Sequence, residues 1–308
     1  MRIGYVSAAA GRPETRLDDI VTEAVRVEAD GFAFFVVPSI FSLDAIGMLI
    51  AAGRETHRIE LVPAVVPTPP RHPAAMAQQA LTAQAASGGR FTLGVGLSHR
   101  AVIEDMFGLS YEKPARQMRE YLSVLVPLLE GKPAAFDGEW YRVHARLDVP
   151  EAKPVSVLVA ALGPRMLEVA GELAAGTVTW MTGLRTLERH VVPSIRRAAA
   201  AAGRGRPRIQ SAVPICLTDD VDAAREACNR NFSIYGKLPS YRAMLDREGA
   251  GRPGDVALLG GEDELRAGLA RHRDVGVDDF ASSVFGVDAD AVARTLAFLK
   301  SESSAYEA

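Results

Sequence analysis

A glycine, a proline and an arginine stand where a strand-like run gives way to a helix-like one. Gly163, Pro164 and Arg165 follow the apolar run 155–161 and precede a helical pattern that begins at Met166. Proline suits the first helical position because it has no N–H to leave unpaired, and glycine lets the backbone approach a ligand closely. The N–H groups of the first turn, the helix dipole and the Arg165 guanidinium would attract an anion. The turn predicts a phosphate site, with a tight turn carrying a solvated arginine as the alternative.

The residues that follow the other predicted strands are mostly apolar and small. They are Ser7–Ala10, 38–39, 65–68, 96–99, 181–183, 217–218 and 285–286. They include no pair of carboxylates, no His, Asp and Glu set spaced for a metal, and no Ser-His-Asp combination. This disfavours hydrolytic and metal-dependent chemistry, and we expect no metal. Such a lining suits a large, flat, apolar ligand held at one end by its phosphate.

Strand-like and helix-like patterns alternate along the chain. The strands and helices that they predict must position the residues named above. The predicted strands are 3–7, 32–37, 59–66, 91–95, 155–161, 177–181, 209–217 and 279–285, and the helices between them are 17–29, 44–55, 73–87, 115–130, 166–173, 187–201, 221–231, 262–273 and 289–300. This alternation predicts an α/β fold, a single (β/α)₈ TIM barrel over residues 1–308. Turn signals around aromatic residues predict an insertion at about 232–254, after strand seven. The alternative, a doubly wound sheet, lacks the expected G-x-G-x-x-G turn after the first strand.

Two further local features stand outside this alternation. Residues 136–143 predict a small hairpin that turns at Asp137-Gly138. The connection from Gly96 to Pro114 is long for a barrel, and long loops on such scaffolds tend to be functional.

Composition narrows the range of partners. Charged residues make up 24% of the chain and the formal net charge is −3, which gives no reason to expect nucleic acid or an anionic membrane. The N-terminus enters a strand directly, without a signal-peptide pattern, and no apolar stretch is long enough to span a bilayer. We expect a cytoplasmic protein. Cys216 and Cys228 have no metal or redox spacing and are expected to be buried thiols.

Three motifs resemble one known superfamily. The run GRFTLGVG at 89–96 resembles the strand-four motif of the luciferase-like monooxygenases. The segment 160–174, AALGPRM followed by AGELA, is similar to the strand-five and helix-five motif of the deazaflavin-dependent branch. Arg71-His72-Pro73, after strand three, matches a third recurring feature. The resemblance covers essentially the whole chain and implies a barrel with an insertion after strand seven.

The resemblance also implies a cofactor across the carboxyl-terminal mouth of the barrel. This would be coenzyme F420, with FMN as the alternative, and its phosphate would lie at Gly163, Pro164 and Arg165. Its ring would lie over the Val65-Val66 strand end, where many members carry a non-prolyl cis peptide. The cofactor-binding residues expected in full are Pro38, Ser39, Val65, Val66, Gly96, Leu97, Ala161, Leu162, Gly163, Pro164, Arg165, Trp180, Met181, Thr182 and Gly183.

The chain departs from the branch at its acid and base positions. Dehydrogenases of the branch place an acid and a histidine after strand two, where this chain has Pro38-Ser39, and a glutamate near Leu97. We therefore expect a reductase acting on a small organic substrate, with His99 or solvent as the proton source. His99 could also be a merely hydrogen-bonded loop histidine. An FMN-dependent monooxygenase and a non-catalytic binding barrel remain as alternatives, and a homodimer is plausible.

Overall fold

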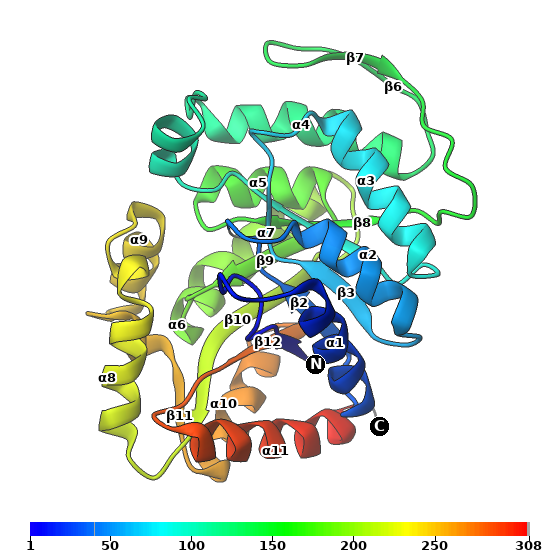
Figure 1. The fold of residues 1–308 in the computed structure, drawn as a ribbon. Helices are drawn as coiled ribbons and strands as arrows, with labels where there is room; N and C mark the ends of the chain where they lie inside the picture. Colours follow the sequence, from blue (N-terminus) through cyan, green and yellow to red (C-terminus); the bar gives the residue numbers. More distant parts are fainter. Residues whose placement is uncertain (40, 307–308) are drawn as a thin grey trace.

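A computed structural model describes residues 1–39 and 41–306. Residue 40 and the last two residues of the predicted 1–308 domain lie outside this range. Parallel strands form a nearly closed barrel surrounded by helices, as the alternating pattern predicts (Figure 1). The strand positions are taken by β1 (Arg2–Val6), β2 (Phe34–Val37), β3 (Glu60–Pro63) with β4 (Val66–Pro67), β5 (Thr92–Gly96), β8 (Ser156–Ala160), β9 (Gly176–Trp180), β10 (Arg208–Leu217) and β12 (Asp279–Val284).

The barrel closes between its third and fourth strand positions. The third position is interrupted by a cis peptide between Ala64 and Val65, which is the cis bond that the family resemblance predicts at this strand end. On the amino-terminal side of the cis peptide, β3 meets β5 through a parallel bridge between Leu61 and Phe91. On its carboxyl-terminal side, β4 pairs with β5 at Val66 and Val95. The bulge at the cis peptide therefore lies on the inner wall near the carboxyl ends of the strands.

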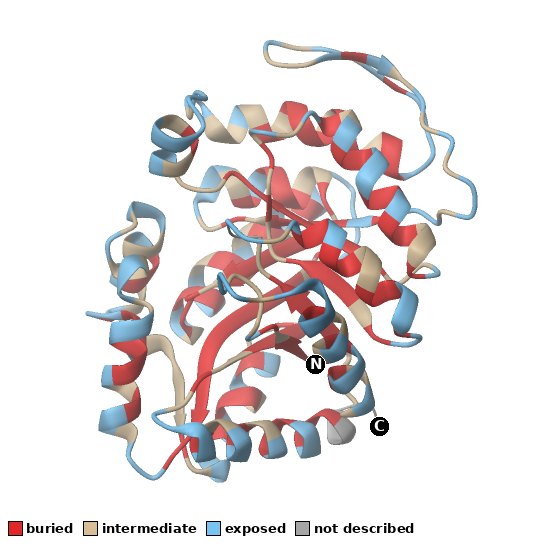
Figure 2. Ribbon diagram, viewed as in Figure 1, coloured by how far each residue is buried: buried red, intermediate tan, exposed pale blue. Residues whose placement is uncertain are grey.

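Helices cover the outside of the barrel. They are α1 (Leu17–Ala29), α2 (Ala45–Glu55), α3 (Pro73–Ala86), α4 (Pro114–Leu129), α5 (Pro164–Leu173), α6 (Leu184–Thr186), α7 (Val192–Ala201), α8 (Val221–Asn231), α10 (Glu262–Asp274) and α11 (Ala289–Tyr306). Buried residues line the strands and the inward helix faces, while the outer faces are exposed (Figure 2). Two π-turns, η1 (Val102–Met106) and η2 (Leu187–Val191), lie in the loop after β5 and just before α7.

Local chemistry explains where several of these elements begin. The Asp44 carboxylate accepts a hydrogen bond from the Gly47 N–H and caps α2, and Pro73 occupies the first turn of α3. Arg90 of the GRF motif donates to the carbonyls of Gly53, Thr56 and Ile59 and so ties β5 to the end of α2. The GRF motif thus has a packing role in this chain beside any role in binding.

The predicted insertion folds into short helices against the mouth of the barrel. It contains η3 (Ser233–Gly236), α9 (Pro239–Glu248) and η4 (Pro253–Val256), and α9 packs against α6. A short strand that the sequence analysis did not predict, β11 (Leu258–Gly260), follows and pairs with the end of β10. Three residues are too few to show a strand period, so the sequence pattern carried no signal for it.

The hairpin turns two residues later than predicted. Its strands are β6 (Ala134–Asp137) and β7 (Arg142–Ala145), and the Gly138 N–H donates to the Tyr141 carbonyl, so the turn falls at Glu139-Trp140. The Glu120 carboxylate of α4 accepts from both turn amides, at 3.1 and 2.9 Å. This long-range carboxylate fixes the turn at Glu139-Trp140, where Asp-Gly preference alone placed it at 137–138.

A partly buried charge cluster closes the amino-terminal end of the barrel. Arg208 pairs with Glu60 at 2.7 Å and with Asp279, and Arg2 pairs with the same two carboxylates at 2.7 and 2.8 Å. Burial raises the pKa of Glu60, but Arg208 and Arg2 outweigh it, so the pKa lies below the ordinary value. This end is a structural plug, which leaves the opposite end for ligands.

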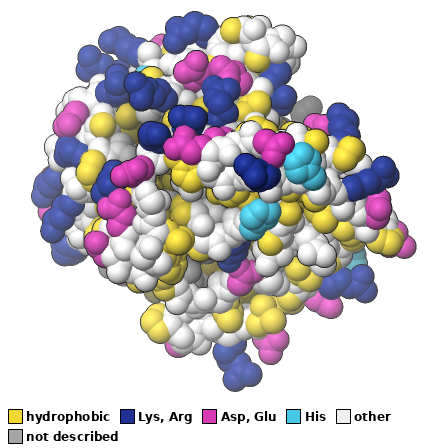
Figure 3. All heavy atoms as spheres, turned by 90° about the horizontal axis from the view of Figure 1, so that it is seen from above, with side chains coloured by type: hydrophobic (Ala, Val, Ile, Leu, Met, Phe, Trp, Pro, Cys, Tyr) yellow, Lys and Arg dark blue, Asp and Glu magenta, His cyan; other side chains and the backbone are white. Residues whose placement is uncertain are grey.

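The structure also bears on membrane spans, on the two cysteines and on the surface charge. Within residues 1–39 and 41–306, no helix is both long and apolar enough to cross a membrane. Cys216 and Cys228 are free and buried, as expected. Acidic side chains lie among the Lys and Arg side chains on the face seen in Figure 3.

Candidate functional site

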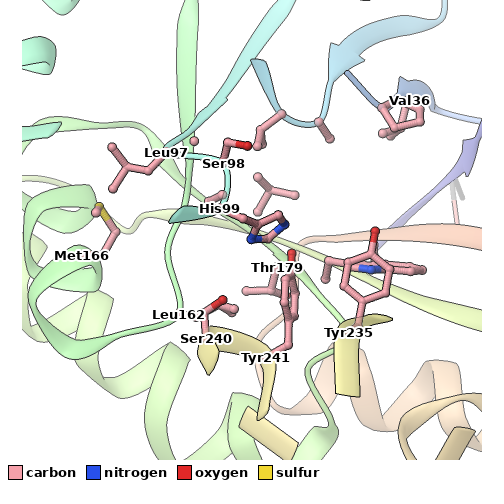
Figure 4. A pocket seen from close by; sticks show the side chains of 18 of the residues that line it. Val36, Leu97, Ser98, His99, Leu162, Met166, Thr179, Tyr235, Ser240 and Tyr241 are labelled. Carbon is pink, nitrogen blue, oxygen red and sulfur yellow. The ribbon is translucent and has the colours of Figure 1, made fainter. Parts of the chain in front are cut away.

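A cavity of about 490 Å³ opens at the carboxyl ends of the barrel strands. Its walls come from the strand ends, the loop after β5, the start of α5 and the insertion, as the close view shows (Figure 4). The residues that line it include Ser7, Pro38, Val65, Gly96, Leu97, Ser98, His99, Tyr111, Leu162, Gly163, Met166, Thr179, Trp180, Phe232, Tyr235, Ser240 and Tyr241. We call this cavity the mouth pocket.

The structure places some of the expected cofactor residues on this wall and others away from it. Those on the wall are Pro38, Val65, Gly96, Leu97, Leu162, Gly163 and Trp180, together with the catalytic candidate His99. Those away from it are Ser39, Val66, Ala161, Pro164, Arg165, Met181, Thr182 and Gly183. No bound ligand tests either group, so their roles stay predictions.

Strand alternation explains much of this division. Side chains of neighbouring strand residues point to opposite faces, so a consecutive run cannot all line one cavity. Val66, Ala161 and Met181 are fully buried, and Thr182 is also inaccessible. The run 180–183 fails for another reason, because β9 ends at Trp180 and the backbone of Met181 is left-handed (φ 54°).

Arg165 lies apart from the mouth pocket. Together with Pro164 it lines a separate surface depression between α5 and α7, which also contains Glu168, Glu172 and Arg197. Gly163, by contrast, is the N-cap of α5 and lies on the wall of the mouth pocket. A Cβ placed on Gly163 would meet no atom within 4 Å, so the space beside the helix start is open. The helix start, more than the guanidinium, is positioned toward a ligand in the pocket.

The cis bulge and a glycine form the facing part of the wall. A Cβ on Gly96 would lie 2.6 Å from Val65 Cγ2 and 3.1 Å from Ala160 Cβ. Glycine is therefore required at position 96 for Val65 to project as it does. Val65, Gly96 and Ala160 together form an apolar shelf at the end of β5, which suits the face of a ring system.

His99 lies in the loop after β5 and faces the insertion. Its ring centroid is 5.9 Å from that of Tyr241. Burial lowers the pKa of His99 below its ordinary value, because the imidazolium loses hydration there. The side chain is consequently neutral at pH 7, able to exchange a hydrogen bond but not poised as a cationic acid.

Aromatic residues of the insertion form a wall that the sequence analysis did not name. The Trp180 ring lies 5.5 Å from Phe232 and 5.7 Å from Tyr235, and Tyr235 lies 4.9 Å from Tyr241, all edge to face. The sequence signal was the recurrence of aromatic residues at 232, 235 and 241 within a segment that breaks the barrel pattern.

Two positioning contacts were also missed. The Glu23 carboxylate of α1 accepts hydrogen bonds from the Ser7 hydroxyl and from the Ala8 N–H, and so holds the chain after β1. His190, in η2, is hydrogen-bonded to the Leu162 carbonyl at 2.7 Å and fixes the turn between β8 and α5. Neither contact had a sequence signal, because the paired residues are 16 and 28 positions apart.

The mouth pocket is electrically neutral. Among the described residues that line it there is no Asp, Glu, Lys or Arg. Burial raises the pKa of Tyr111, Tyr235 and Tyr241, so their hydroxyls stay protonated. In the part of the chain that the structure describes, no group of three or more His, Cys, Asp or Glu side chains could hold a metal ion.

Comparison with known proteins places this geometry in context. The family model of luciferase-like monooxygenases matches residues 1–301. An uncharacterized protein of Mycobacterium tuberculosis is 29% identical over 276 residues, covering 77% of this chain and 81% of the relative. A 5,10-methylenetetrahydromethanopterin reductase of Archaeoglobus fulgidus is 30% identical over 208 residues, covering 66% and 60%.

Solved structures share the fold. A coenzyme F420 dependent tetrahydromethanopterin reductase from Methanopyrus kandleri superposes with a TM-score of 0.80 at 22% identity, covering 99% of both chains. The oxygenating constituent of 3,6-diketocamphane monooxygenase of Pseudomonas putida, in complex with FMN, has a TM-score of 0.78 at 18% identity, covering 99% and 98%. At these identities the likeness shows the fold alone. Because the family model spans nearly the whole sequence, the chain belongs to the luciferase-like monooxygenase family.

Proposed function

We propose that this protein is an F420-dependent oxidoreductase that reduces a small organic substrate in the mouth pocket. Membership of the family supports the coarser statement, a flavin- or deazaflavin-dependent oxidoreductase. The deazaflavin is favoured by the motif residues 160–174 and by the reductases named above among the relatives. FMN is favoured by the structural likeness to an FMN-bound monooxygenase, and it is the second candidate.

The observation that carries the proposal is the pairing of an apolar shelf with an open helix start. Val65 and Gly96 give an apolar face for a ring system, and Gly163 leaves free space at the positive end of α5. Both lie on one cavity of about 490 Å³. A tricyclic ring with a phosphate-bearing side chain fits this combination.

The reactive chemistry, hydride transfer, would be supplied by the bound cofactor. The chain's own residues would hold the ring against the shelf and exclude water from the apolar pocket. The neutral His99 can donate or accept a hydrogen bond to the substrate, and the absence of carboxylates from the described lining leaves proton supply to His99 or solvent. A barrel that binds a cofactor without turnover would show cofactor affinity but no substrate reduction.

The test replaces the glycine that leaves the helix start open. Gly163 has φ −78° and ψ 154°, a conformation that valine adopts readily, so Gly163→Val fills the space without backbone strain. We expect the F420 affinity to fall at least about tenfold in a fluorescence titration, a loss of about 1.4 kcal/mol. Gly205→Val is the matched control, because a Cβ there also meets no atom within 4 Å but lies outside the pocket. If the wild type and Gly163→Val bind F420 with equal affinity, the cofactor phosphate does not bind at Gly163.

A further inference from the structure

The neutral wall of the mouth pocket restricts which molecules can enter it. A buried charge without a partner is costly, and none of the described lining residues offers a countercharge. Away from the helix start at Gly163, a carboxylate or an ammonium group would therefore be disfavoured. The part of the substrate that lies against the aromatic wall of the pocket must be uncharged.

Two phenols of the insertion are among the polar groups of the wall, which also include the side chains of Ser98, His99, Tyr111, Thr179 and Ser240. Tyr235 and Tyr241 rise from η3 and α9 with their hydroxyls toward the cavity (Figure 4). Among the described residues, neither hydroxyl donates its proton to a protein acceptor. Two unused donors in an apolar pocket favour a ligand that brings an acceptor oxygen, because leaving them unpaired after desolvation costs free energy.

The surrounding rings define the shape of that ligand. Trp180, Phe232, Tyr235 and Tyr241 form one edge-to-face network along one side of the pocket. Edge-to-face arrays leave ring faces and edges available for a further aromatic or flat cyclic group.

We infer that the substrate is an uncharged, ring-bearing carbonyl compound whose oxygen accepts hydrogen bonds from the hydroxyls of Tyr235 and Tyr241. This inference rests on the proposed function, since it describes the substrate of that same pocket. The two tyrosines are then specificity-determining residues, and their aromatic rings and their hydroxyls make separate contributions to binding.

Calorimetric titration of the full chain with three matched probes tests the inference. The probes are 2-acetylnaphthalene, which is an uncharged ketone, 2-naphthoate, which carries a negative charge, and 2-ethylnaphthalene, which lacks the oxygen. We expect the ketone to bind at least about tenfold more tightly than the carboxylate. The double variant Tyr235→Phe/Tyr241→Phe should weaken ketone binding by roughly fivefold to tenfold and change binding of 2-ethylnaphthalene less than about twofold.

Controls separate this outcome from loss of structure and from failure of the proposed function. Phenylalanine keeps both rings, and Tyr141→Phe removes a hydroxyl from a tyrosine outside the pocket lining and should alter none of the three affinities. Naphthoate binding as tight as ketone binding, an unchanged ketone affinity in the double variant, or no ketone binding at all would overturn the inference. F420 is titrated separately on the same preparations. If the protein selects the ketone but does not bind F420, the proposed function is wrong and the inferred ligand preference stands. If it binds F420 but does not select the ketone, the inferred ligand preference is wrong and the proposed function stands.

Discussion

The imidazole of His99 lies 5.9 Å from the ring of Tyr241, centroid to centroid, at an interplanar angle of 58°. The contact joins the loop after β5 to the insertion, through two residues that are 142 positions apart in the sequence. Both residues line the mouth pocket, and the contact contributes to the burial that keeps His99 neutral.

The first prediction concerns the titration of His99. Because burial lowers the pKa of His99, we expect its NMR titration midpoint to lie below the ordinary value of about 6.5. Tyr241→Ala should expose the imidazole and move the midpoint upward, toward that value. Phe232→Ala, which removes another ring of the same pocket, should leave it in place. A midpoint that does not respond to Tyr241→Ala would show that the Tyr241 ring does not shield His99.

The second prediction concerns acid stability. Burial lowers the pKa of His272 from 6.5 to about 4, and its Nδ1 is hydrogen-bonded to the Gly268 carbonyl at 2.8 Å. Between pH 6.5 and pH 4 the unfolded chain binds a proton at this site and the folded chain does not, so folding stability falls as the pH falls through that window. The loss should reach roughly 3 kcal/mol at the acid end.

The measurement is urea unfolding at several pH values for the wild type and for His272→Gln. The variant has no titrating group at this position, so its unfolding free energy should fall less between pH 6.5 and pH 4. Parallel pH profiles for the two proteins would contradict the assignment.

The third prediction concerns the shelf that would hold the ring. Gly96→Ala places a Cβ 2.6 Å from Val65 Cγ2, and should cost about 1–3 kcal/mol in unfolding free energy. Val65→Ala removes that Cγ atom, so the double variant should recover part of the loss. The double-mutant cycle reports the interaction directly. Strict additivity of the two changes would mean that Gly96 and Val65 do not constrain each other.

The barrel was predictable from sequence because each of its strand positions carries its own apolar run. Strands such as 209–217 are buried on both faces and stand out between polar helices. The turn Gly163-Pro164 was recognisable for a similar reason, since it depends on residues adjacent in the chain. The three-residue β11 and the hairpin turn set by Glu120 depended on distant partners and were therefore not predictable from local pattern.

The site was only partly predictable for the same physical reason. Local pattern identifies the end of a strand, but not which of two neighbouring side chains faces the cavity. Trp180 lies on the wall while Met181 is buried behind it. The wall made by Tyr235 and Tyr241 depends on how the insertion folds back over the mouth, which no short-range signal encodes.

The fourth prediction concerns the charge cluster at the closed end. Glu60→Ala leaves Arg208 without one of its two carboxylate partners in a largely buried place, and should lower the unfolding free energy by about 2–4 kcal/mol. Asp148→Ala is the control, since Asp148 is 81% exposed and its pairing with Arg146 is worth at most about 1 kcal/mol. Neither change should alter ligand binding at the opposite end of the barrel. Similar losses for both variants would mean that the cluster is not a structural plug.

The most direct test of the central claim is a paired equilibrium titration of the wild-type protein with coenzyme F420 and with FMN under identical conditions. The open helix start at Gly163 and the shelf at Val65 and Gly96 predict that a phosphate-bearing ring cofactor binds, and the 160–174 motif predicts a dissociation constant for F420 at least about tenfold below that for FMN. Tighter binding of FMN, or binding of neither cofactor, would contradict the account.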